Sequence, residues 1–183
     1  RAFEGALAAS VGGVMPAYPI LRGPEIGGQP IEPVGAGFSS LLLGRLLRGE
    51  LGFNGLILSD WAITQDCPEP CRNPTAENPQ TPAAIATSWG VEHLSKAERF
   101  ALGLQAGIDQ FGGVDDPAPL AEAVAGGLIS RDRINESVAR IMEAKFRLGL
   151  FDNPYADPDR ASEIIGHPDF AGKVNVWWGD PTL

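Results

Sequence analysis

Short apolar runs alternate along the chain with segments whose apolar residues recur at helical spacing. The runs at residues 11–15, 56–61 and 108–111 predict short buried strands. Helical spacing recurs in five segments, at residues 1–10, 39–47, 95–106, 119–125 and 130–147. Strands that alternate with helices are typical of right-handed βαβ units, so the pattern predicts an α/β fold with a parallel sheet.

The second run, Leu56–Trp61, ends abruptly in Ser59, Asp60 and Trp61. Such folds place their chemistry at the carboxyl ends of parallel strands, so Asp60 is a candidate catalytic residue. The alternative is that Asp60 caps the following turn or pairs with a basic neighbour, as strand-to-turn aspartates commonly do.

The other two strands also end near polar groups. Met15 closes the first apolar run and is followed by Pro16, Ala17 and Tyr18, while Asp109 lies in the third. We expect Tyr18 and Asp109 on the same face as Asp60, with a structural hydrogen bond favoured for Asp109 over a contact with substrate. For Tyr18 and Trp61, the alternative to a role in the site is ordinary core packing with the polar tip in solvent.

Two segments predict loops. Residues 19–37 are rich in Gly and Pro, and residues 62–93 carry repeated prolines over a length that favours a functional loop above a site. Cys67 and Cys71 lie in the second loop, where a disulfide and two free thiols both remain open. A metal site would need further ligands, and we expect neither a metal nor a cofactor. The carboxylates of this loop are expected to be solvated, although one could serve as an acid; they are Glu69, Glu77 and Glu92.

Composition narrows the classes of partner. The 183 residues carry a net charge of −9, which argues against nucleic acid and anionic membrane surfaces as partners. No apolar run approaches the ~18 residues that span a bilayer. The compartment stays open between the bacterial periplasm, secretion and the cytoplasm.

Four segments, in order, resemble glycoside hydrolase family 3. Leu47–Gly55 with Ser59-Asp60-Trp61 resembles the nucleophile region of that family, and Val14–Tyr18 precedes it at the usual distance. The other two segments are similar to the last barrel strand and to the closing helix with its exit; they are Ala106–Phe111, and Ser137–Ile141 with Lys145–Phe151 and Pro154-Tyr155.

The resemblance implies that residues 1–157 are the last three βα units of a (β/α)8 barrel, the N-terminal domain of the family. Residues 158–183 are expected to be a linker or tail, in which Lys173–Leu183 matches no element. The earlier strands and a following α/β sandwich domain, or oligomer mates, would then complete the site.

The resemblance also implies a retaining β-glucosidase-like hydrolase that acts on a β-linked oligosaccharide or β-glucoside. Asp60 would form the covalent glycosyl-enzyme, Tyr18 would donate a hydrogen bond to it, and Trp61 and Met15 would contact substrate. The alternatives are an inactive carbohydrate-binding or scaffold remnant and a transglycosylase.

Overall fold

The computed structural model describes residues 3–81 and 86–169, which fall into two compact units. Unit 1 comprises residues 1–144 and unit 2 comprises residues 145–183. Each unit is described separately, and all candidate site residues belong to unit 1.

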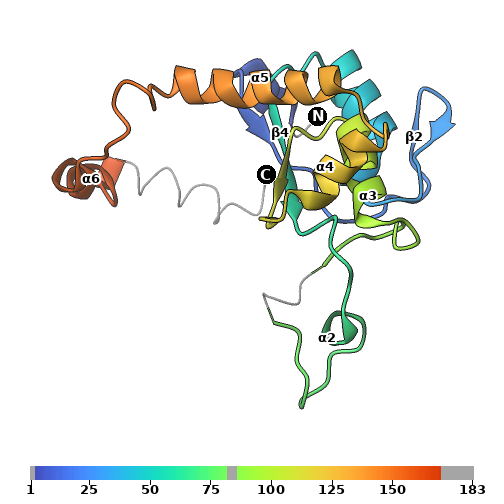
Figure 1. Ribbon diagram of the computed structural model, residues 1–183. Coiled ribbons are helices and arrows are strands. Elements are labelled where there is room, and N and C mark those ends of the chain that lie inside the picture. The colour runs from blue at the N-terminus through green and yellow to red at the C-terminus, as the bar shows by residue number, and fades with distance from the viewer. Residues whose placement is uncertain (1–2, 82–85, 170–183) are drawn as a thin grey trace, which may run out of the picture. The chain divides into compact units, whose positions relative to one another are not determined.

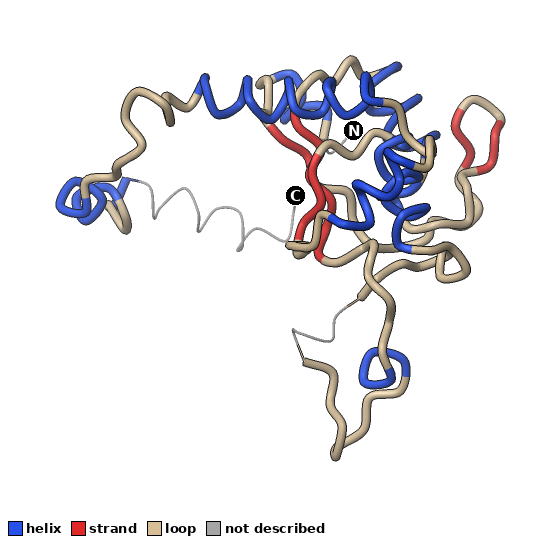
Figure 2. The backbone as a smooth tube through the Cα atoms, in the orientation of Figure 1, coloured by secondary structure: helices blue, strands red, loops and turns tan. Residues whose placement is uncertain are grey.

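A three-stranded parallel sheet forms the centre of unit 1, with the order β1-β4-β5 (Figure 2). The strands are β1 (Gly13–Val14), β4 (Leu56–Trp61) and β5 (Gln110–Gly112). Val14 pairs with Ile57, and Leu58 pairs with Gln110. The predicted α/β class is therefore confirmed, although β1 and β5 are shorter than the apolar runs that predicted them.

The predicted helices form, some with different bounds or geometry. They are α1 (Glu4–Ala8), the π-helix η2 (Leu41–Glu50), α3 (Lys96–Ala106), α4 (Ala118–Ala125) and α5 (Arg131–Arg147). A capping box starts α3, because Ser95 Oγ accepts the Glu98 N–H at 3.3 Å and Glu98 Oε2 accepts the Ser95 N–H at 2.8 Å. Figure 1 shows α3 and α4 packed together beside the sheet.

Regular structure also occurs where the sequence predicted loops. The segment 19–37 contains the antiparallel hairpin of β2 (Glu25–Ile26) with β3 (Gln29–Pro30), followed by the short helix η1 (Ala36–Phe38). The long loop after β4 contains one helical turn, α2 (Glu69–Arg72).

In unit 2, part of the segment expected to be a linker or tail is helical. Asp157 caps a short helix, α6 (Pro158–Ile164), by accepting the Asp159 N–H at 3.0 Å. The rings of Phe146 and Phe151 pack with their centroids 4.5 Å apart. The segment Lys173–Leu183, for which the sequence predicted no element, lies outside the described residues.

One core cluster of unit 1 lies where η2 packs on the sheet. Ile57 of β4 and Ile108, just before β5, are fully buried against Leu43 of η2 and Phe53. Gly107 adopts a φ of +130°, and a Cβ at this position would lie 3.3 Å from the Leu43 side chain. A glycine therefore lets the turn into β5 approach η2 closely.

Within the described residues, no helix is long and apolar enough to cross a membrane.

Asp109 is buried at the amino end of the sheet. The expectation that it shares a face with Asp60 is therefore wrong. Its backbone N–H donates to Ile57 O at 2.8 Å, and its Oδ2 accepts the Ile57 N–H at 3.0 Å. Ile57 stands near the start of β4, whereas Asp60 stands near its end. Since parallel strands run in one direction, Asp109 lies well away from Asp60 along the sheet.

Three arginines from two helices converge on this carboxylate. Arg48 of η2 reaches Oδ2 at 2.6 Å, and Arg140 of α5 reaches Oδ1 at 2.9 Å. Arg133 lies 3.5 Å from Oδ1, and the Ser137 hydroxyl donates to Oδ1 at 3.0 Å. Burial lowers the pKa of Arg48, and the Asp109 charge opposes that effect. Asp109 therefore stabilises the junction of the sheet, η2 and α5, as the structural interpretation predicted.

Asp109→Asn should destabilise unit 1 by about 3 kcal/mol, because it removes a buried counter-charge from three partly buried arginines. The melting temperature should fall by about 6–12 °C, measured by circular dichroism. Asp115→Asn, at an exposed position, is the matched control and should leave the melting temperature unchanged. Equal melting temperatures for the two variants would contradict the role given to Asp109.

Candidate active site

Asp60 lies at the carboxyl end of β4, on a backbone that is tied to β5. The buried Ser59 hydroxyl accepts the Gly112 N–H at 2.9 Å and donates to the Asp60 carbonyl at 2.8 Å. Ala62 then adopts a φ of +55°, which is uncommon for a residue with a side chain, and its N–H donates to Gly112 O at 2.9 Å. These contacts fix the point at which the strand turns into the long loop.

The Asp60 carboxylate has two neighbours with hydrogen-bond donors. Its Oδ1 accepts the Trp61 N–H at 2.7 Å. Burial raises the pKa of the Tyr18 phenol, and so do a hydrogen bond to Asp60 and the negative charge of that carboxylate. The structure therefore brings together Tyr18 and Asp60, which are far apart in the sequence.

Met15 and Trp61, the other predicted site residues, both expose their side chains. Met15 directly follows β1 and is 60% exposed. Trp61 is 56% exposed, and its indole lies against Gly113, where an added Cβ would come within 2.5 Å of the ring. One side of the Trp61 ring is thus supported by backbone while much of the ring faces solvent.

Trp89 is a neighbour of this site that was not among the predicted site residues. Its ring lies 6.0 Å from the ring of Tyr18, centroid to centroid, at an interplanar angle of 53°. Thr87, two residues earlier, donates its hydroxyl to the Trp61 carbonyl at 3.1 Å. The signal in the sequence is a tryptophan followed by Gly90, at the far end of a long loop that begins after Asp60.

Arg99 of α3 ties the two ends of that loop together. It is buried and donates to Thr64 O at 3.2 Å and to Val91 O at 3.1 Å. It also pairs with Asp66 at 2.7 Å, and that hydrogen bond lowers the pKa of Asp66. The loop is therefore anchored at its base.

Cys67 and Cys71 form a disulfide within the loop, with Cα atoms 5.4 Å apart, which decides between the two alternatives left open by the sequence. The side chains of the loop carboxylates are exposed, in agreement with the solvated interpretation; these residues are Glu69, Glu77 and Glu92. Within the described residues, no group of three or more His, Cys, Asp or Glu side chains is arranged to hold a metal ion.

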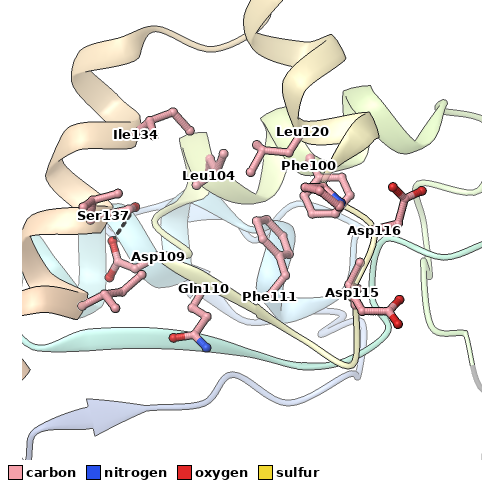
Figure 3. Close-up of a pocket in the computed structure, with 14 residues that line it drawn as sticks. Phe100, Leu104, Asp109, Gln110, Phe111, Asp115, Asp116, Leu120, Ile134 and Ser137 are labelled. Atoms are coloured by element: carbon pink, nitrogen blue, oxygen red, sulfur yellow. Dashed lines mark hydrogen bonds between the residues drawn. The ribbon is translucent and has the colours of Figure 1, made fainter. Parts of the chain in front are cut away.

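A separate pocket of about 350 Å³ lies on the helical side of β5 (Figure 3). Phe111 points into it between Leu104 of α3 and Leu120 of α4, and Asp109 lies at one end. Its lining residues include neither Asp60 nor any of the aromatic residues around it. The chemistry suggested by Asp60 therefore belongs to the carboxyl end of the sheet and not to this pocket.

A carboxylate with Trp61 and Tyr18 as neighbours stands at the carboxyl end of a parallel sheet, where folds of this class place their chemistry. Residues 1–144 match the model of the glycosyl hydrolase family 3 N terminal domain. The chain belongs to this family, as its sequence motifs predicted.

Named relatives agree with this assignment. The chain is 48% identical over 169 residues to a periplasmic β-glucosidase/β-xylosidase of Dickeya chrysanthemi, covering 92% of this chain and 26% of the relative. It resembles a β-glucosidase of Listeria innocua in complex with isofagomine, with a TM-score of 0.58, 25% identity, and coverage of 89% and 19% of the two chains. The fold also matches a β-glucoside phosphorylase bound to 2FGlc, with a TM-score of 0.60, 22% identity, and coverage of 88% and 26%. The chain thus spans about a quarter of the length of the first of these relatives.

The raised pKa of Tyr18 gives a test of the contact with Asp60. Tyr18 and Tyr155 are the two tyrosines of the chain, so Tyr155→Phe leaves Tyr18 as the one phenol that titrates. In that background, we expect the Tyr18 phenol to ionise at a pH above its ordinary pKa of 10.0. The measurement is a pH titration in which the absorbance of tyrosinate is recorded. A pKa that is raised by folding stabilises the protein below pH 10.0, and this contribution is lost as the pH rises through the folded pKa.

Adding Asp60→Asn should lower the pKa of Tyr18 toward the ordinary value, because the neighbouring negative charge is removed while burial persists. Adding Asp115→Asn instead is the control and should leave the titration curve in place. A curve that does not move with Asp60→Asn would mean that the two groups are not in contact.

Proposed function

We propose that this chain carries the nucleophile of a retaining β-glycosidase, with Asp60 in that role. The supporting observation is the position of Asp60 at the carboxyl end of β4, with the Tyr18 phenol as its neighbour, in a family 3 domain. The named relatives support β-glucosides as the substrate class, and the name of the first relative also includes β-xylosidase.

The proposal includes the architecture. Three parallel strands cannot close a barrel, and eight are needed for the (β/α)8 type. We infer that residues 1–157 are the last three βα units of such a barrel, and that further strands pair with the outer edges of β1 and β5. A longer protein, in which this chain is one part, agrees with the coverage of the relatives.

The proposed reaction has two steps. The Asp60 carboxylate attacks the anomeric carbon, the bond to the leaving oxygen breaks, and a second carboxyl group about 5–5.5 Å away donates a proton to that oxygen. The same group then removes a proton from water, which attacks the anomeric carbon and releases Asp60 with the sugar in its original configuration. We propose that the second carboxyl group comes from outside residues 1–183.

The neighbours of Asp60 have defined parts in this proposal. The Trp61 N–H donates to the carboxylate, the Tyr18 hydroxyl serves as a second donor beside it, and the two hold the carboxylate in one orientation. The exposed side of the Trp61 indole packs on the C–H face of the sugar. Met15 contacts the substrate from the end of β1.

A chain of residues 1–183 alone should show no measurable turnover of a nitrophenyl β-glucoside, because the proposed acid/base group is missing. The measurement is release of nitrophenol at the highest soluble protein concentration. Robust release would contradict this expectation and implicate a loop carboxylate, with Glu69→Gln, Glu77→Gln and Glu92→Gln as the variants that identify it.

In the longest protein that contains this chain, Asp60→Asn should abolish covalent labelling by a fluoro-sugar inactivator and lower kcat/KM by at least about 10⁴-fold. Intact-mass spectrometry detects the adduct. Asp115→Asn is the matched control and should be labelled at the wild-type rate. Labelling of the Asp60→Asn variant would remove Asp60 from the role of nucleophile.

A further inference from the structure

Trp89 is a large apolar side chain that remains exposed beside the candidate site. It is 43% exposed, although the residues around it in the sequence are buried; these are Ala86, Thr87, Ser88 and Val91. Exposing an indole forgoes the free energy of burying it, so a tryptophan held at the surface beside a site is suited to a ligand contact.

The backbone around Trp89 is fixed on both sides. The Trp89 carbonyl accepts the Gly35 N–H at 2.9 Å. Gly90 adopts a φ of +82°, and an added Cβ there would lie 2.5 Å from the Pro33 carbonyl oxygen. Hydrogen bonding and close backbone packing thus hold the indole at a defined position, which reduces the entropy lost when a ligand binds.

Tyr18 connects Trp89 to the nucleophile. Burial and the neighbouring Asp60 carboxylate raise the pKa of its phenol, and its ring lies 6.0 Å from the ring of Trp89, centroid to centroid. The Tyr18 side chain therefore has both Asp60 and Trp89 as neighbours. The Thr87 hydroxyl bonds to the Trp61 carbonyl, so the segment that carries Trp89 is also tied to the end of β4.

We propose that Trp89 is a specificity-determining residue that packs against the leaving group of the substrate; this inference rests on the proposed function. The sugar under attack must lie directly against Asp60, and its hydroxyl groups need polar partners. The leaving group departs on the side of the anomeric carbon opposite the nucleophile, one ring farther from the carboxylate. An exposed apolar face packed beside Tyr18, the neighbour of Asp60, suits this second position, and it favours aryl or other apolar leaving groups.

The test compares two steps of the reaction in the longest protein that contains this chain. Trp89→Ala should lower kcat/KM for a nitrophenyl β-glucoside about five- to tenfold, the scale of one lost aromatic contact. It should change kcat/KM for methyl β-glucoside by less than about twofold, because a methyl leaving group offers little surface to pack. The reactivation rate of the isolated fluoro-glycosyl enzyme in buffer should match the wild type, because the leaving group has already departed.

Trp89→Phe is the conservative variant and should recover most of the preference for the aryl substrate. An equal loss on both glucosides, or a slower reactivation, would overturn the proposal, because either result means that Trp89 acts through Tyr18 and Asp60. Unchanged kinetics for Trp89→Ala would overturn it as well. Failure of the wild-type protein to form the fluoro-sugar adduct would instead refute the proposed function itself, so the two failures are distinguishable.

Discussion

The buried ion cluster at Asp109 is the constraint on which the rest of unit 1 depends. One carboxylate accepts the Ile57 N–H and faces Arg48, Arg133 and Arg140, so the sheet, the π-helix η2 and the helix α5 meet at a single group. Desolvating these charges costs free energy that is regained only when every partner is in place. The cluster therefore favours one register of β5 on β4, and that register decides what the opposite end of the sheet presents.

At the opposite end, the same pairing holds Asp60 in position. Ser59 and Ala62 bond across to Gly112, so the strand cannot slide without breaking contacts on both sides of the carboxylate. Tyr18 arrives from β1 and Trp61 follows directly in the chain, which surrounds the carboxylate with donors and aromatic faces before any further part of a longer protein is added. The amino end thus provides stability, and in the proposed function the carboxyl end provides the chemistry.

The sequence predicted the features that local pattern encodes. The strand Leu56–Trp61 and the helix expected at residues 95–106 were predicted correctly, because apolar runs and helical spacing depend on near neighbours. The helix at α6 was missed, since a short helix after a proline has little apolar periodicity. Two further features were not predicted, because they depend on contacts between residues distant in sequence. They are the position of Asp109 at the amino end of the sheet and the approach of Trp89 to Tyr18. No periodicity encodes such contacts, and a two- or three-residue strand leaves its register open to a shift of one or two positions.

In the proposed mechanism, Asp60 forms the covalent bond to the sugar. The most direct test of this role is to trap the intermediate with a fluoro-sugar in the wild-type protein, digest it, and locate the adduct by tandem mass spectrometry. If Asp60 is the nucleophile, we expect one adduct, on the peptide that contains Ser59-Asp60-Trp61. The fragment ions should place the added mass on Asp60. An adduct on any other carboxylate would contradict this mechanism.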